Sequence, residues 1–277
     1  MPWRVTQGLT NPALSQASIL HFYALFEMRS RTLQPCAYTV VVTSCRRFDL
    51  LRPSLTTLKQ ALDVEPQKWI VIEDSDDESV RACVAEAGIR ASVIVNGTQI
   101  GQMRSIDRAY AEVETPYVFH SEDDWSFYRS GFIRESAALL EADPRISMVG
   151  LRSRPDQNPL VRHMPSLSHE GIGYFMLDPR LHPEYFGYCF NPGLRRLSDY
   201  RAIGPFAALG HEADVSYAFK QRGFAIANLE AHAVRHLGEG RHVHDPTMPP
   251  KARTLSQRLT RSIQKRWKRL KRALPGT

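Results

Sequence analysis

Apolar and polar positions alternate between residues 37 and 124 in a pattern that predicts strands and helices in turn. Four short apolar runs are typical of strands in a sheet that is covered on both faces, namely residues 37–44, 68–72, 92–95 and 117–120. Three segments between them carry apolar residues at helical spacing, namely residues 49–62, 78–87 and 101–114. This alternation predicts an α/β domain with a mainly parallel sheet.

Beyond residue 124 the pattern is less regular. The remaining predicted helices are residues 131–142 and 212–222, and the remaining predicted strands are 146–151, 225–229 and 234–237. Residues 152–172 are rich in Pro, Arg, His and Ser and are expected to form a long loop, and residues 174–194 are expected to form short strands and turns. The chain is therefore divided into an extension with one helix, an α/β domain and a tail, at residues 1–34, 35–245 and 246–277.

Polar residues follow the predicted strands at the points where they end. In a parallel sheet these ends meet at one edge, where the fold places its ligand crevice. The fourth strand runs directly into three carboxylates, in the stretch YVFHSEDDW of residues 117–125. Carboxylates crowded together repel one another, so a cationic partner is expected, and Mg²⁺ or Mn²⁺ favours such oxygen ligands together with nucleotide phosphates. A solvated acidic loop that caps a following helix is the alternative.

Together these stretches resemble the glycosyltransferases of the GT-A fold, most closely the inverting enzymes similar to family 2. The resemblance covers roughly residues 37–237. It implies a Rossmann-like GT-A domain that binds a nucleotide-sugar donor, with a UDP-sugar as the first candidate, and Mn²⁺ or Mg²⁺. By the same resemblance, the nucleotide-sugar would contact Thr43, Ser44, Arg47, Asp74 (or Glu73), Arg104, Glu122 and Asp123, and the metal would contact Asp124 and His236.

The segment GHEADVSYAFKQRGF, residues 210–224, is similar to the G-E-D-x-D-L segment of that family. The match places Glu212 at the catalytic base, although Asp214 also fits, because His211 and Glu212 replace the usual Glu-Asp pair. Both acids could instead simply favour the N-terminus of a helix. The resemblance implies metal-dependent transfer of a hexosyl or N-acetylhexosaminyl group to a hydroxyl acceptor with inversion. Zinc is disfavoured, since the histidines around His236 match no common structural zinc motif.

Two other functions are weighed against this one. A nucleotidyltransferase of related fold would need a Gly-rich loop and a Lys after the first strand, and the sequence TSCRR there has neither. A non-catalytic module could retain a degenerate sugar-nucleotide site and recruit partners through the tail. The retention of all three acids, Glu212 and His236 in one chain speaks against that module.

The net charge of +7 belongs to the tail. Ten Lys or Arg residues lie between residues 251 and 272, and without them 26 basic residues face 29 acidic ones, so the body has a charge of −3. Apolar residues follow one side of a predicted basic amphipathic helix, namely Leu255, Leu259, Ile263, Trp267, Leu270 and Leu274. This pattern fits an anionic membrane surface near a glycan or lipid-linked acceptor. A helix docked on the domain with a solvated basic face fits equally well, and nucleic acid ranks lower because the body is not basic.

A cytoplasmic location, with a peripheral position at the inner face of the membrane, is expected from three further features. Four cysteines lie far apart without a CxxC pair, which suits reduced thiols. The first ten residues lack the pattern of an export leader, and the apolar run at residues 17–28 is too short to span a bilayer.

Overall fold

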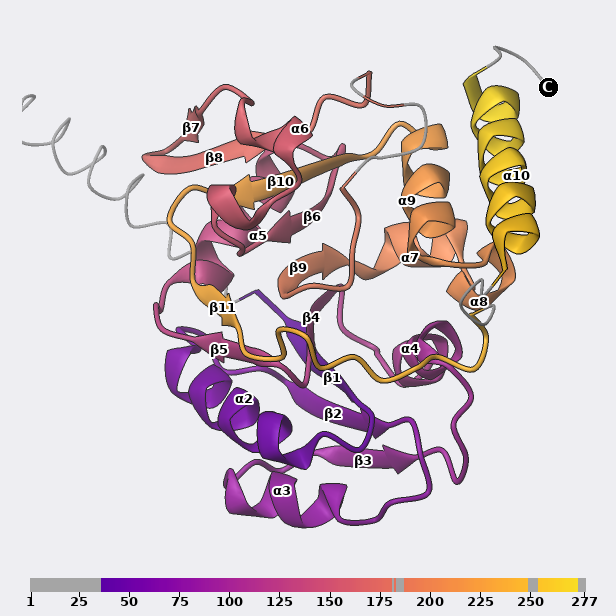
Figure 1. Ribbon diagram of the computed structural model, residues 1–277. Coiled ribbons are helices and arrows are strands. Elements are labelled where there is room, and N and C mark those ends of the chain that lie inside the picture. Colours follow the sequence, from indigo (N-terminus) through magenta and orange to yellow (C-terminus); the bar gives the residue numbers. More distant parts are fainter. Residues whose placement is uncertain (1–35, 181, 183–186, 249–253, 274–277) are drawn as a thin grey trace, which may run out of the picture. The chain divides into compact units, whose positions relative to one another are not determined.

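The computed structural model describes residues 36–180, 182, 187–248 and 254–273 (Figure 1). By its internal contacts the chain divides into a unit of residues 1–35 and a unit of residues 36–277, and all described residues belong to the second. The helix expected within residues 1–34 therefore lies outside the described residues.

The predicted α/β fold is confirmed. A nine-stranded sheet has the order β3-β2-β1-β4-β9-β6-β10-β8-β7. The first four strands along the chain pair in parallel, namely β1 (Tyr38–Ser44), β2 (Lys68–Glu73), β3 (Ser92–Val95) and β4 (Tyr117–Glu122). A second parallel pair is formed by β6 (Ile146–Gly150) and β10 (Ala225–Leu229). Because the strands β1 to β4 are apolar along most of their length, helices can cover both faces of this half of the sheet.

The other strands run against their neighbours. β9 (Gly193–Arg196) is antiparallel to both β4 and β6 and joins the two parallel parts of the sheet. At the far edge, β8 (Ile172–Met176) pairs antiparallel with β10 and with β7 (Leu167–His169). The region expected as one long loop therefore contains β7, a 3₁₀ turn at Arg154–Asp156 and the short helix α6 (Pro159–Arg162). Short edge strands of this kind carry too few residues for a clear periodicity.

A strand, not a helix, follows the acidic cluster directly. β5 (Trp125–Phe127) pairs antiparallel with β11 (Val234–His236) in a separate two-stranded sheet. The helix predicted at residues 131–142 is confirmed as α5 (Phe132–Ala142), which begins one residue later than predicted. The acidic residues thus lie in a tight connection between two strands, which excludes a role as a simple helix cap.

Two hydrophobic clusters lie on the two faces of the sheet. One is formed with α2 (Phe48–Ala61), α3 (Val80–Glu86) and α5, and the other with α4 (Gln102–Tyr110), α7 (Leu197–Ile203), α8 (Phe206–Leu209) and α9 (Glu212–Gln221). The side chains of β1 alternate between them, because Val40 and Val42 belong to the first cluster and Val41 to the second. The last helix, α10 (Leu255–Ala273), lies beside α9 (Figure 1).

The register of the strands brings their carboxyl ends to one level. Thr43 of β1 is opposite Glu122 of β4, and Ser44 is opposite Glu73 of β2. The residues that follow these positions therefore meet at one edge of the sheet, as the sequence predicted. No helix in the described part of the chain combines the length and the apolar character needed to cross a membrane.

Candidate active site

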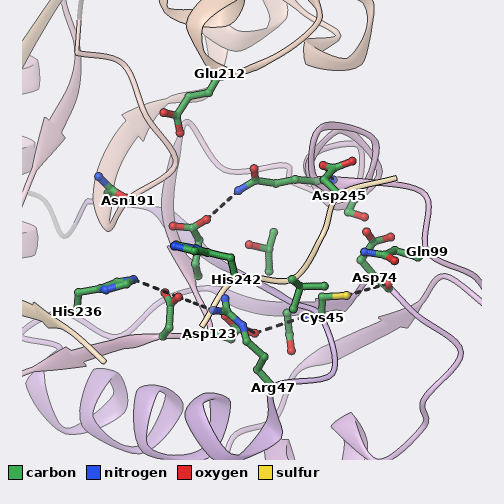
Figure 2. Close-up of a pocket in the computed structure, with 17 residues that line it drawn as sticks. Cys45, Arg47, Asp74, Gln99, Asp123, Asn191, Glu212, His236, His242 and Asp245 are labelled. Atoms are coloured by element: carbon green, nitrogen blue, oxygen red, sulfur yellow. Dashed lines mark hydrogen bonds and ion pairs between the residues drawn. The ribbon is translucent and has the colours of Figure 1, made fainter. Parts of the chain in front are cut away.

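A cavity of about 340 Å³ opens at the carboxyl ends of β1, β2 and β4, and Figure 2 shows the side chains around it. Most of the predicted site residues line it, namely Thr43, Ser44, Arg47, Asp74, Glu122, Asp123, Asp124, Glu212 and His236. Arg104 and Asp214 are not among its lining residues. The fold therefore brings predicted site residues that are far apart in the sequence, from Thr43 to His236, to the edge of the sheet where the parallel strands end.

Arg47 holds the two aspartates of the acidic cluster. Its guanidinium group donates to both carboxylate oxygens of Asp123, at 3.2 Å from Nε to Oδ2 and over a short contact from Nη2 to Oδ1. It also donates to Oδ2 of Asp124 at 2.8 Å. Both aspartates are buried, and buried carboxylates need a cationic or hydrogen-bonding partner. Burial raises the pKa of Asp123 to about 7, although the Arg47 guanidinium opposes this rise.

His236 reaches Asp124 through the small sheet. It stands opposite Trp125 in the pairing of β11 with β5, and its ring packs edge-on against that of Trp125 at 4.9 Å. Its Nε2 lies 3.2 Å from Oδ2 of Asp124. The next turn passes so close that a Cβ atom on Gly238 would lie 2.6 Å from the same oxygen. The chain around β11 is thus fitted closely to the Asp124 carboxylate.

A divalent metal ion fits the donor set at this point. Oδ1 of Asp124 is buried and has no hydrogen-bond partner among the described residues, and Asp124 and His236 line the same cavity. Within the described chain, no three His, Cys, Asp or Glu side chains are placed to hold a metal by themselves. A carboxylate and an imidazole leave most coordination positions to other ligands, which suits an ion that is shared with phosphate oxygens.

Glu122 lies beside this cluster and carries a raised pKa. Its Oε1 accepts a hydrogen bond from the side-chain amide of Gln102 at 2.8 Å. Burial, with the nearby carboxylates of Asp124, Glu212 and Asp123, raises its pKa to about 8. A neutral Glu122 can also donate a hydrogen bond, for example to a ribose hydroxyl or a sugar hydroxyl.

Glu212 and Asp214 have different surroundings although they share the first turn of α9. Glu212 points into the cavity from the side opposite Asp123 and His236 (Figure 2). Its Oε2 accepts a hydrogen bond from the backbone of Phe190 at 3.3 Å. Part of the residue is exposed to solvent. Many protein atoms nevertheless lie around its carboxyl group, and this partial desolvation raises the pKa of Glu212 above the ordinary value of 4.5.

Asp214 is occupied by structural contacts. It completes a capping box with His211 at the start of α9. Its Oδ1 accepts a hydrogen bond from Arg272 at 2.6 Å and another from Lys268, both on α10. Although burial acts to raise its pKa, these two cations lower it. Of the two acids proposed for proton transfer, Glu212 alone has its carboxylate in the cavity, so we favour Glu212.

Asp74 holds a loop at one end of the cavity in place. Its carboxylate accepts hydrogen bonds from the backbone of Ile100 at 2.8 Å and Gly101 at 2.9 Å, and from the Asn96 side chain at 2.9 Å. These contacts hold the loop that leads into α4. Glu73, the alternative to Asp74, turns away and accepts from the backbone of Arg46 at 2.9 Å.

The segment after β11 passes α4 (Figure 1), and part of it lines the cavity. Arg241 forms an ion pair with Asp49 at 2.6 Å at one end. At the other end, Oδ2 of Asp245 accepts from the backbone of Gln102 at 2.9 Å. The backbone at Gly101 (φ +95°) approaches this segment so closely that a Cβ atom there would lie 2.7 Å from Thr247. His242, Val243 and Asp245 of this segment line the cavity.

Comparison with solved structures identifies the architecture. A mannosyltransferase from Pyrobaculum calidifontis, solved with GDP-Man and Mn²⁺, superposes with a TM-score of 0.55 at 11% identity over 78% of this chain and 63% of that one. S. aureus TarS with UDP-GlcNAc gives 0.55 at 10% identity over 78% and 62%. Glucosyl-3-phosphoglycerate synthase from Mycobacterium tuberculosis, with Mn²⁺ and UDP, gives 0.50 at 14% identity over 98% and 88%.

The chain has the GT-A glycosyltransferase fold. It spans less than two thirds of the length of the first two of these proteins. Neither a protein-family model nor a curated relative matches the sequence.

Several lining residues of this GT-A domain were not predicted from the sequence, namely Cys45, Gln99, Gln102, Ser105, Asn191, His242, Val243 and Asp245. One signal was available for Gln102 and Ser105, because residues three apart share a face of a helix. The buried Met103 and Ile106 mark the inner side of α4, whereas Arg104 is exposed. The residues after β11 carried no such signal, since they reach the cavity through an irregular segment.

Proposed function

We propose that this protein is a metal-dependent glycosyltransferase that moves a sugar from a nucleoside diphosphate to a hydroxyl acceptor with inversion. One observation carries the proposal: the pair Asp124–His236, 3.2 Å apart, and the carboxylate of Glu212 line one cavity from opposite sides. One side suits a diphosphate with its cation, and the other suits a proton acceptor. The GT-A fold supports this assignment.

The donor would lie along the edge of the sheet. Thr43, Ser44 and Asp74 line the end of the cavity that suits the nucleoside, and Glu122 and Asp123 are placed for ribose or sugar hydroxyls. A cavity of about 340 Å³ is within the range of small-molecule sites. The similar proteins were solved with GDP-Man and with UDP-GlcNAc, which supports a hexosyl or N-acetylhexosaminyl donor. We take a UDP-sugar as the first candidate.

Asp124 and His236 would hold the divalent ion, Mn²⁺ or Mg²⁺. When bound, such an ion supplies positive charge that stabilises the diphosphate as it leaves. Arg47 places a guanidinium group against Asp123 and Asp124 and offsets part of their negative charge, so a bound divalent ion would supply the remaining positive charge that an anionic phosphate needs. The similar mannosyltransferase and the synthase were both solved with Mn²⁺.

Glu212 would act as the base. Its ionised carboxylate accepts the proton of the acceptor hydroxyl while the hydroxyl oxygen bonds to the anomeric carbon. The bond from that carbon to the β-phosphate oxygen breaks, and the nucleoside diphosphate leaves with the electron pair. One displacement from the face opposite the leaving group inverts the anomeric centre. The raised pKa of Glu212 makes it a stronger base than an ordinary carboxylate.

Calorimetric titration tests the proposal first. UDP-, GDP- and dTDP-sugars are titrated into the protein with and without Mn²⁺, and hydrolysis of the bound donor is then followed by release of nucleoside diphosphate. We expect metal-dependent binding of one nucleotide class and slow metal-dependent hydrolysis. Binding without hydrolysis or transfer would indicate the non-catalytic module. Release of pyrophosphate from a nucleoside triphosphate would indicate a nucleotidyltransferase.

We also propose a cytoplasmic protein that works at the inner face of a membrane, where glycan or lipid-linked acceptors are found. The support for this location is the character of α10. Eight Lys or Arg residues and no acid occur within Leu255–Ala273.

A further inference from the structure

The apolar stripe of α10 is exposed. Its five described members follow one side of the 19-residue helix, whereas the predicted sixth member, Leu274, lies outside the described residues. The exposed fractions are 82% for Leu255, 64% for Leu259, 58% for Ile263, 59% for Trp267 and 53% for Leu270. At about 1.5 Å per residue the helix is about 28 Å long. A surface helix that packs on its own domain buries such a stripe, so this exposure is an unusual feature.

Charged contacts determine which side of α10 faces the domain. Lys268 and Arg272 both pair with Asp214 of α9, and the Arg272 guanidinium lies 4.2 Å from the ring centre of Tyr217. At about 100° per residue, Lys268 and Arg272 fall on the side of the helix opposite Ile263. The polar side therefore holds the domain and the apolar stripe faces away from it. This reverses the orientation of a docked helix with a solvated basic face.

Basic residues border the stripe as well as filling the opposite side. By the same rotation, Arg266, Arg269 and Lys271 flank the apolar residues, and Lys271 lies 5.5 Å from the ring centre of Trp267. A helix with Trp and Leu on one side and Lys and Arg around them is typical of binding in the plane of a membrane interface. Its partner must offer both negative charge and an apolar layer.

We propose that α10 is a docking surface for a bilayer that contains anionic lipids. The apolar stripe enters the headgroup region, the flanking cations meet the lipid headgroups, and Asp214 holds the helix to α9 on its other side. A second copy of the chain fits less well, because two α10 helices would bring eight positive charges against eight. Nucleic acid offers the negative charge but leaves the four aliphatic side chains of the stripe in water.

This docking would also orient the enzyme. Asp214, which holds α10, is two residues from Glu212 in the first turn of α9, and Glu212 lines the cavity. A membrane-bound α10 would therefore keep the cavity at a constant height and angle to the lipid surface. The docking surface itself does not depend on the proposed activity.

Sedimentation with vesicles tests the proposal on the full chain. Vesicles of neutral phosphatidylcholine are compared with vesicles that contain about one third phosphatidylglycerol. We expect binding to the anionic vesicles only, weakened at least about tenfold by high salt, because each basic residue near the surface contributes roughly fivefold. The double variant Leu259→Glu/Trp267→Glu should lose at least a further tenfold relative to its control.

The matched control is Ser262→Glu/Gln264→Glu, which makes the same change in charge on exposed positions of α10 and leaves the stripe intact. Far-UV circular dichroism and the melting temperature verify that both variants fold. A direct readout is the fluorescence of Trp267, since Trp69 and Trp125 are buried; it should shift to shorter wavelength on anionic vesicles in a Trp3→Phe background.

Three results would overturn the proposal. In the first, the stripe variant binds vesicles as well as its control. In the second, the wild-type chain ignores vesicles and is a dimer by light scattering that the stripe variant dissociates. In the third, it ignores vesicles and binds a 20-nucleotide DNA equally well with and without the stripe substitutions. If the wild-type chain binds vesicles but shows no glycosyl transfer, that result would count against the proposed function and not against the docking surface.

Discussion

The two sides of the cavity differ in how their carboxylates are paired. Near β4 and β11, the aspartates contact basic side chains. Near α9, the carboxylate of Glu212 accepts one hydrogen bond among the described residues. Asp123 and Asp124 share the guanidinium of Arg47, and Asp124 also meets His236. Glu212 accepts from the backbone of Phe190. The first arrangement holds groups in fixed positions, and the second leaves a carboxylate ready to take a proton. These surroundings agree with the roles in binding and in proton transfer that we propose for the two sides.

The largest expected effect comes from the binding side. Asp124→Ala removes the carboxylate that faces both His236 and the cavity, so metal-dependent donor binding should be abolished and transfer should fall by roughly 10³-fold or more. Calorimetry of the donor with and without Mn²⁺ measures this loss. The control is Asp76→Ala, which removes an exposed acid paired with Arg46 and should leave donor binding unchanged. If the Asp124 variant still bound the donor in a metal-dependent way, the metal site would have to be assigned to other residues.

The chemical side should respond differently. Glu212→Gln keeps the shape of the side chain and removes its basicity, so donor binding should persist while kcat falls by about 10² to 10⁴-fold. Donor affinity and single-turnover transfer separate the two quantities. The matched variant is Asp214→Asn, on the same turn of α9, which should loosen α10 and keep most of the turnover. Normal transfer by the Glu212 variant, with loss in the Asp214 variant, would shift the base role to Asp214.

These two positions also indicate what the sequence could predict. The strands β1 to β4 and the acidic residues at their ends were predicted because parallel strands with apolar interiors end at one edge of a sheet. The choice between Glu212 and Asp214 could not be predicted. It depends on Lys268 and Arg272, which pair with Asp214 and lie more than 50 residues further along the chain. Likewise β9, which joins the two parallel parts of the sheet, has only four residues and no clear alternation.

The tail shows the same limit. The sequence predicted the helix and its apolar stripe, since spacing alone defines both. It did not predict which side would face the domain, because that depends on the ion pairs to Asp214. Periodicity thus locates elements, and contacts between distant residues decide how each element is used.

A third prediction concerns the stability of the binding side. Arg47→Gln leaves Asp123 and Asp124 buried without their guanidinium partner, which should lower the free energy of unfolding by about 3 kcal/mol. Mn²⁺ should restore part of that loss, because a bound cation stabilises the same carboxylates. Denaturant unfolding with and without Mn²⁺ measures both quantities. Arg46→Gln is the control, since its ion pair with Asp76 is exposed and should contribute less than about 1 kcal/mol. Equal losses in the two variants would mean that Arg47 is not the main counter-charge.

The smallest expected effect is a difference between the pH profiles of kcat and kcat/KM. This difference distinguishes the two sides of the cavity. A base acts when deprotonated, so kcat should fall as the pH drops through the pKa of Glu212, which burial raises above 4.5. In the free protein, burial raises the pKa of Asp123 to about 7. A proton on Asp123 removes negative charge that favours a cation beside Asp124, so kcat/KM should decline from a higher pH than kcat does. Steady-state rates from pH 5 to 9, with saturating and with limiting donor, give the two profiles. If both declined together near the ordinary pKa of a glutamate, the side that binds and the side that accepts the proton would be electrostatically alike, and the contrast between them would have no role in the reaction.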